Sequence, residues 1–373
     1  MIDFGLSEEQ EALQRAAREF LVRECPPTLV RETAGTPDGV PRTLYAKMAE
    51  LGWMGLAVPE KDGGLGLGAL DLAVILEELG RAAAPGPFLG TQLLIAALLR
   101  AGSRAQRRAW LPRLISGDTL GALAYLEESD RHDAAGVTTA ARRTREGYRL
   151  RGRKLFAQGV PGADLLLVAA RTGRGISLFL VEASTPGVRS RPSETIDLTR
   201  RVGEVELREV ALPPSARLGR EGDGAALLAH LLDLGAVGIA ADCLGGAARA
   251  LEMAVEYAQV REQFGRKIGS FQAIKHMAAE MAAEVEPARS LVWYAAYTLD
   301  HRPRAAARAA SIAKARLAEV YDRTVERAVQ IHGGIGFTWE HDLHFWFKRA
   351  RWNTVAFGDG DFHRERIATI DRY

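Results

Sequence analysis

The sequence is poor in features that mark several classes of protein. It has only 2 cysteines in 373 residues, Cys25 and Cys243, and neither lies in a Cys/His pattern of the kind that binds metal. A disulfide framework and a cysteine-based metal site are therefore excluded. The formal net charge of +2 argues against a surface built for nucleic acids. The arginines between Arg142 and Arg153 lack an accompanying row of aromatic residues, so we interpret them as solvated strand faces and loops.

The sequence also shows no targeting segment and no long apolar run. The N-terminus, Met1 to Gln10, is acidic and soon helical, unlike a signal peptide. No apolar run approaches the ~20 residues that a membrane span needs. We therefore expect a cytoplasmic protein that binds neither nucleic acid nor a membrane. The composition, 47% hydrophobic and 26% charged, is typical of a globular protein.

Helical periodicity occupies both ends of the chain, and strand patterns occupy the middle. The expected N-terminal helices run to about residue 23 and at 43–51, 69–81, 89–101 and 105–115. Short apolar segments between turn residues predict strands at 120–126, 147–150, 165–170, 177–182 and 204–210. After Gly224, long helices are expected: one through the stripe 244–258, one capped by Ser270, and others at 304–330, 343–354 and 362–370.

These patterns predict an α+β fold with three parts. They are an N-terminal helical bundle at residues 1–117, a small antiparallel β domain at 118–222, and a C-terminal four-helix bundle at 223–373.

Two glycine-containing segments at helix junctions carry candidate nucleotide-binding groups. The first runs from Arg261 through Phe264 and Gly265 to Gln272, and the second contains Gln330, Gly333 and Gly334. A guanidinium presents forked donors to phosphate oxygens, and glycine lets backbone approach a ligand closely. On the residues alone, a solvent-exposed helix end is the favoured interpretation of Arg261 and Gln272.

The order of these motifs on these elements, including Pro59, Gly63 and Gly64 in the N-terminal part, resembles the acyl-CoA dehydrogenase family along the whole chain. The resemblance implies an FAD enzyme, usually tetrameric, that oxidises an acyl-CoA thioester to a 2-enoyl-CoA. A carboxylate removes the α-proton, and the flavin accepts the β-hydride.

The resemblance also implies roles for the residues at both junctions. Arg261 and Gln272 would hold the pyrophosphate of an FAD seated mainly on a neighbouring subunit. Gln330, Gly333 and Gly334 would hold its adenosine end. Phe264 would either pack on the adenine or fill the helix junction. Asp359 and Asp361 occupy positions whose side chains usually touch FAD, although a carboxylate near the pyrophosphate is electrostatically unfavourable.

The chain departs from the family at both known positions of the catalytic base. The matching residues are Phe357 and Gly235, and neither can accept a proton, so no catalytic residue is assigned to this chain. Asp359 is the best substitute carboxylate, but a structural role in the turn is favoured. Asp242 lies too far along its helix from Gly235 to share a pocket position.

The β domain departs from the family as well. The flavin-binding loop is replaced by an acidic stretch that we interpret as solvated, with Glu127, Glu128, Asp130 and Asp133. The following segment keeps an aromatic ring at Phe156, two residues after Lys154, but not the family's threonine. His132 and His332 are interpreted as non-catalytic.

These departures favour one hypothesis and leave others open. The chain resembles the base-lacking subunit of bacterial heterotetrameric dehydrogenases of steroid side-chain breakdown, which complete the FAD site of a homologous partner subunit. An acyl-CoA substrate and an electron-transfer flavoprotein-like acceptor are the other implied partners. Alternatives are a homo-oligomer with a displaced base such as Asp359, a non-catalytic acyl-CoA-binding or scaffold protein, and a flavin oxidase or monooxygenase.

Overall fold

The computed structural model describes residues 5–372, and these fold into two units. The helical unit contains the chain up to residue 31, Ala69–Ala84 and the residues from 236 onward. The β unit contains Glu32–Gly68 and Pro85–Gly235. The division predicted at residues 117 and 222 stays a prediction.

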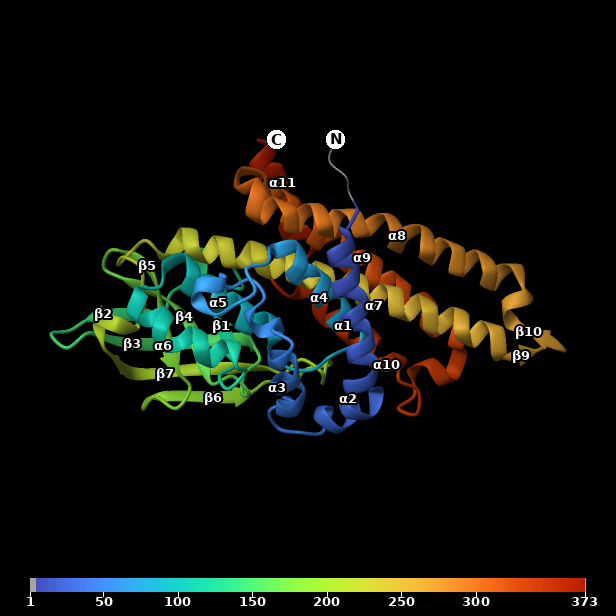
Figure 1. The fold of residues 1–373 in the computed structure, drawn as a ribbon, viewed down its shortest axis with the longest axis horizontal. Helices are drawn as coiled ribbons and strands as arrows, with labels where there is room; N and C mark the ends of the chain where they lie inside the picture. Colours follow the sequence, from blue (N-terminus) through green and yellow to red (C-terminus); the bar gives the residue numbers. More distant parts are fainter. Residues whose placement is uncertain (1–4, 373) are drawn as a thin grey trace. The chain divides into compact units, whose positions relative to one another are not determined.

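Long helices supply the core of the helical unit. They are α1 (Glu8–Glu24), α4 (Ala69–Arg81), most of α7 (Gly224–Val260), α8 (Gln272–His301), α9 (Pro303–His332), α10 (Leu343–Val355) and α11 (Gly360–Asp371). Helix α9 packs against α8, α10 and α11 (Figure 1). Helices α4 and α7 cross closely at Gly80 and Gly245. A Cβ at either position would collide with a backbone carbonyl of the other helix, so the close approach requires glycine at both.

A sheet and three helices make up most of the β unit. The helices are α3 (Arg42–Glu50), α5 (Phe88–Ala101) and α6 (Arg104–Ile115). The strands are β1 (Gly121–Ala124), β2 (Ala140–Arg143), β3 (Tyr148–Gln158), β4 (Leu165–Thr172), β5 (Gly175–Glu182), β6 (Val188–Pro192), β7 (Val202–Leu212) and β8 (Arg217–Leu218). Their order is β6-β7-β3-β2-β4-β5-β8, with β1 beside β4. Inward-facing residues such as Leu150, Val168 and Phe179 form its buried core.

The predicted α+β architecture is confirmed, with helices at both ends of the chain and a β domain between them. The sheet is not purely antiparallel, because β4 pairs in parallel with both β1 and β2. Long connections separate these strands, and parallel pairing requires such connections. The sequence missed β2 and β6 because their arginine-rich residues show little apolar alternation. It also missed α2 (Pro27–Ala34) and the two-residue strand β8.

Ser270 is not the N-cap of α8, contrary to the prediction. Its hydroxyl donates a hydrogen bond to the Lys267 carbonyl at 2.7 Å, and Phe271 occupies the cap position without a side-chain bond. A short 3₁₀ turn, Ile268–Ser270, separates the serine from the helix.

One helix in the described residues is long and apolar enough to cross a membrane by length and composition, which the sequence analysis did not anticipate. It is α7, and 78% of its most apolar window is buried inside the protein. A buried helix of this kind is apolar all round because it contacts core residues on every side.

Candidate cofactor-binding site

The first junction, Arg261 to Gln272, is a small hairpin between α7 and α8. Strands β9 (Glu262–Gln263) and β10 (Arg266–Lys267) flank a tight turn in which Phe264 and Gly265 have φ of 56° and 74°. Arg261 and Gln272 are exposed at its two ends. The Phe264 side chain is 92% exposed, so the alternative in which it fills the helix junction is wrong. Its packing against an adenine stays a prediction.

The second junction follows α9 and forms a 3₁₀ turn, Gly333–Phe337. Gln330, Gly333 and Gly334 are all exposed, and Gly333 has a φ of 64°. Among the residues that the structure describes, none lies within 4 Å of where a Cβ on Gly333 or Gly334 would be. The backbone here faces open space, as a surface that receives a ligand requires.

The structure brings the two junctions to the same end of the helical unit. Tyr257 lies one helical turn before Arg261, and His332 lies two residues after Gln330. The Tyr257 and His332 rings stack with centroids 4.5 Å apart, which ties the end of α7 to the end of α9. Figure 1 shows β9 and β10 at this end, where α7 and α8 meet. Candidate phosphate and adenosine contacts therefore share one surface.

His332 supports this surface from below. Its Nδ1 donates to the Ala328 carbonyl at 2.7 Å, and its side chain is buried. Burial lowers the pKa of His332, which keeps the ring neutral near pH 7.

The turn that holds Phe357 lies between α10 and α11. Phe357 and Gly358 have φ of 57° and 99°. The fully buried Lys314 ammonium donates to the Gly358 carbonyl at 2.8 Å and to the Thr354 carbonyl at 3.2 Å. Burial lowers the pKa of Lys314 to about 8, against the opposing effect of Cys243 and Asp359. The chain's own groups thus fill the space around this turn.

Asp359 and Asp361 both have partners within the chain. The Asp359 carboxylate accepts from the Phe362 backbone N–H at 2.8 Å and caps α11. This is the structural role that the sequence favoured. The Asp361 side chain is 94% exposed and pairs with Arg364 at 2.9 Å. Contact of either carboxylate with FAD stays a prediction.

The second position at which the resemblance places a base lies on α7. Gly235 is buried there and offers no side chain. Further along the helix, the Asp242 carboxylate is fully buried and accepts from the Asn353 side-chain amide at 2.8 Å. The Arg349 guanidinium lies 3.6 Å from the same carboxylate. Asp242 is therefore part of a core polar network.

The acidic loop of the β unit corrects one prediction. Glu127 is not solvated but buried, and it accepts hydrogen bonds from the backbone N–H groups of Thr138 and Thr139 at 2.9 and 3.0 Å. The fully buried Lys154 ammonium lies 2.5 Å from its carboxylate. Burial alone would raise the pKa of Glu127, but Lys154 and the hydrogen bonds outweigh burial and lower it to about 2.

The sequence signal for this pair was the position of Lys154. It lies on the inward-facing alternation of β3 with Tyr148 and Leu150, where a charged residue needs a buried partner. The partner lies 27 residues earlier, beyond any local pattern.

The other polar residues of this loop are held locally. Asp133 accepts from the Gly136 N–H and pairs with Arg131, and His132 shares a 2.7 Å hydrogen bond with the Tyr125 hydroxyl. Glu128 is exposed, as predicted. Phe156, at the expected flavin-facing position, has a φ of 50° and a side chain that is 59% exposed.

The donor set at the two junctions fits a phosphate-bearing cofactor such as FAD. It offers an exposed guanidinium, two exposed amides and open backbone at Gly333 and Gly334. Within residues 5–372, no cluster of three or more His, Cys, Asp or Glu side chains is arranged to hold a metal ion.

Comparisons with known proteins agree on one family across the chain. Residues 7–118, 122–210 and 222–370 match the N-terminal, middle and C-terminal domains of acyl-CoA dehydrogenase. An acyl-CoA dehydrogenase of Bacillus subtilis is 33% identical over 374 residues, covering 96% of this chain and 97% of the relative.

Two similar solved structures each carry two protein names in their titles. The ChsE4-ChsE5 complex from Mycobacterium tuberculosis matches with a TM-score of 0.90 and 31% identity, covering 99% of this chain and 98% of that chain. A Tcur3481-Tcur3483 steroid ACAD variant matches with a TM-score of 0.88 and 30% identity, covering 98% of each chain. This chain therefore belongs to the acyl-CoA dehydrogenase family, whose members are FAD-dependent flavoproteins that dehydrogenate acyl-CoA.

Proposed function

We propose that this chain is the base-lacking subunit of a heteromeric FAD-dependent acyl-CoA dehydrogenase. It completes the FAD site of a homologous partner subunit that carries the catalytic glutamate. The observation that carries the proposal is a contrast between sites. Both base positions hold Phe357 and Gly235, whereas the donors Arg261, Gln272 and Gln330 are present and exposed.

The hydrogen bonds of the nearby carboxylates argue that neither Asp359 nor Asp242 acts as a displaced base. Asp359 caps α11 through its Oδ1, and Asp242 is bound by Asn353. A general base must be free to reach the α-proton of the substrate within about 3 Å. A carboxylate held as a helix cap or in a buried network does not meet that requirement.

In the proposed complex, this chain binds and orients the cofactor. Arg261 and Gln272 hold the pyrophosphate through charge-assisted and neutral hydrogen bonds, and the backbone at Gly333 and Gly334 approaches the adenosine end. FAD supplies the hydride acceptor for the β-carbon of the substrate, and an electron-transfer flavoprotein-like acceptor then receives the electrons. The α-proton goes to the partner's glutamate.

A bulky acyl-CoA is the proposed substrate, with a steroid side-chain thioester as the leading candidate. Gly235 and Ala236 put two small residues on a helix that borders the acyl pocket in the family. Similar solved structures with two different protein names, one of them titled a steroid enzyme, support the same choice.

The test is to purify the chain alone and after co-expression with a homologue that carries the glutamate. We expect the chain alone to be colourless and inactive, and the complex to show a flavin spectrum and to oxidise a steroid side-chain CoA thioester faster than butyryl-CoA. A yellow, active homotetramer of this chain alone would overturn the proposal. A colourless complex would support a scaffold instead.

Arg261→Ala tests the cofactor contact within the complex. Loss of a charged hydrogen bond costs about 1.5–3 kcal/mol, so we expect flavin affinity to fall roughly 10- to 100-fold. The matched control is Arg304→Ala, which removes an exposed arginine at the first turn of α9. Equal flavin retention in both variants would contradict the trans contact.

A further inference from the structure

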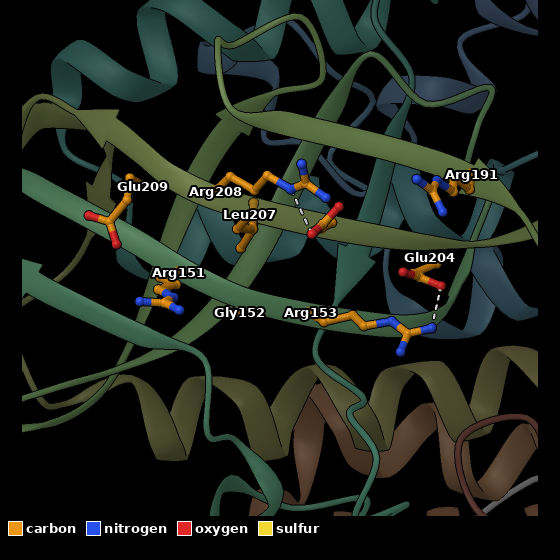
Figure 2. Close-up of a pocket in the computed structure, with 9 residues that line it drawn as sticks. Arg151, Gly152, Arg153, Arg191, Glu204, Leu207, Arg208 and Glu209 are labelled. Carbon is orange, nitrogen blue, oxygen red and sulfur yellow. Dashed lines mark hydrogen bonds and ion pairs between the residues drawn. The ribbon is translucent and has the colours of Figure 1, made fainter.

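The outward face of the β unit holds a broad hollow lined mainly by charged side chains. Its volume is about 760 Å³, and it lies over strands β3, β6 and β7 (Figure 2). The lining residues are Arg151, Gly152, Arg153, Arg191, Glu204, Glu206, Leu207, Arg208 and Glu209. All belong to the β unit.

Strand alternation places these charges on one face. On β3, Tyr148 and Leu150 are buried, whereas Arg149, Arg151 and Arg153 are exposed. The strand register then aligns charges across the sheet. Arg153 lies opposite Glu206, which in turn lies opposite Arg189, and Glu204 lies opposite Arg191. Arg142 on β2 lies opposite Arg149.

This face concentrates the positive charge of the protein. We call the following set the arginine face: Arg142, Arg149, Arg151, Arg153, Arg189, Arg191 and Arg208, with Glu204, Glu206 and Glu209. Seven arginines and three glutamates leave an excess of four positive charges, which Glu128, 3.6 Å from Arg153, reduces to three, whereas the whole chain has a formal net charge of +2. The remainder of the protein is therefore net negative.

The two central glutamates are already paired. Glu204 accepts from Arg153 at 2.6 Å (Figure 2). Glu206 accepts from Arg208 at 2.7 Å. These hydrogen bonds lower the pKa of both glutamates, so both are ionised at neutral pH.

Arg149 donates to the Glu209 carbonyl at 3.3 Å, and the other four arginines keep their donors available. Across residues 5–372, Arg151 and Arg191 form no hydrogen bond and no ion pair within 4 Å, and the same holds for Arg142 and Arg189. Each guanidinium offers five N–H donors in a planar fork that matches a carboxylate.

The mixture of charges selects the kind of partner. No aromatic side chain lines the hollow for base stacking, which argues against single-stranded nucleic acid as the partner. Leu207 is the one large apolar side chain in the lining, whereas small-molecule pockets are mostly apolar. Alternating charge suits a protein surface, where complementary charges set register and association rate.

We infer that the arginine face is a docking surface for an acidic protein, bound through carboxylates that pair with Arg151 and Arg191. The inference does not depend on the proposed dehydrogenase function. Because these groups are exposed, the association is strongest at low ionic strength and weakens as salt screens the charges.

The test uses a fluorescent oligo-glutamate peptide as the probe for an acidic protein surface. Binding to the full chain is followed by anisotropy at about 20 and about 150 mM salt. We expect binding at low salt that weakens at high salt. The Arg151→Glu/Arg191→Glu double variant should raise Kd at least tenfold, roughly the effect of a few charge pairs.

The matched control is Arg104→Glu/Arg108→Glu on α6, which makes the same change in net charge at exposed positions outside the arginine face. It should leave Kd within about twofold of the wild type, because screening limits distant charges. Equal weakening by both double variants, or no peptide binding at low salt, would overturn the inference. So would tighter binding of tripolyphosphate or single-stranded DNA than of the peptide. If the glutamate variant misfolds, Arg151→Gln/Arg191→Gln provides the same test.

Discussion

Two turns of the helical unit each contain a glycine with a positive φ, but the surroundings of the two glycines differ. The turn after α9 has Gly333 at a φ of 64°, and the turn after α10 has Gly358 at a φ of 99°. A Cβ on Gly358 would collide with the Phe362 ring, whereas a Cβ on Gly333 would meet no described residue within 4 Å. We call them the filled turn (Val355 to Gly360) and the open turn (His332 to Phe337).

The difference indicates which turn can bind a ligand from outside the chain. In the filled turn, Lys314 binds two carbonyls and Asp359 caps the next helix, so the chain satisfies its own polar groups. The open turn instead presents backbone and the Gln330 amide to its surroundings. The filled turn is one of the two positions at which the resemblance places a base, and here its polar groups have partners within the chain.

The largest expected effect comes from Gly358→Ala. Alanine at this positive φ is strained, and its Cβ would overlap the Phe362 ring, so the free energy of unfolding should fall by about 3 kcal/mol. Chemical denaturation of the purified chain measures it.

Gly334→Ala is the matched control in the open turn. No described neighbour lies near its Cβ position, so we expect a change in stability within about 0.5 kcal/mol. Weaker flavin retention in the heteromeric complex should accompany this small change. Equal destabilisation by both alanines would show that the two turns do not differ.

Lys314→Met tests how much Lys314 stabilises the filled turn. Removing the ammonium leaves the Gly358 and Thr354 carbonyls without their donor, and hydrogen bonds from charged groups contribute about 1.5–3 kcal/mol. We therefore expect a loss of about 2 kcal/mol in the free energy of unfolding. Lys275→Met, at an exposed position on α8, should change it little. An unaltered stability for Lys314→Met would show that other groups hold the turn.

Asp359 variants separate a helix cap from a catalytic base. Asp359→Ala should cost about 1 kcal/mol of stability, whereas Asp359→Asn should cost almost nothing, because asparagine is an equally good N-cap. Turnover by the heteromeric complex should be unchanged in Asp359→Asn. Abolished turnover with flavin still bound would instead identify Asp359 as the base.

A pH dependence of stability is expected close to the open turn. His344 is buried, and across the described chain neither of its ring nitrogens has a hydrogen-bond partner. Burial lowers its pKa from 6.5 to about 4, with added effects from Lys348 and Arg31 that Asp342 opposes, and a smaller lowering from His341. The pKa of His344 is lower in the folded protein than in the unfolded chain. The contribution of His344 to the free energy of unfolding is therefore fully present above pH 6.5 and is lost as the pH falls toward 4.

His344→Phe should therefore flatten the acid limb of the stability profile between pH 6.5 and 4. Its ring can keep the contacts with Trp339 and Phe345. Melting temperatures across this range, compared with those of the exposed-site variant His276→Phe, measure the change. An identical profile for the wild type and His344→Phe would place the acid sensitivity elsewhere.

The fold was predictable where periodicity runs long. Helices at 69–81 and 304–330 were predicted within two residues of α4 and α9, because each buries a regular stripe against the core. Strands β2 and β6 were missed because they lie at exposed positions where arginines replace the apolar alternation.

The sequence predicted which residues of the candidate site could bind a cofactor, but it did not predict that they lie on one surface. The spacing around Arg261 and Gln330 indicated phosphate donors, but only the Tyr257–His332 stack shows that the two segments share one surface. Glu127 was misread as solvated because its partner Lys154 lies 27 residues away in sequence.

The sequence by itself determined that neither Phe357 nor Gly235 can act as a base, since no fold can turn either residue into a proton acceptor. It also determined the helical stripes and the donor residues at the two junctions. Only the tertiary structure decided which polar groups are satisfied within the chain and which face outward. Burial and hydrogen bonding depend on neighbours that long-range packing supplies, so Lys314, Asp359 and Glu127 are enclosed while Arg261, Gln330 and Arg151 remain exposed.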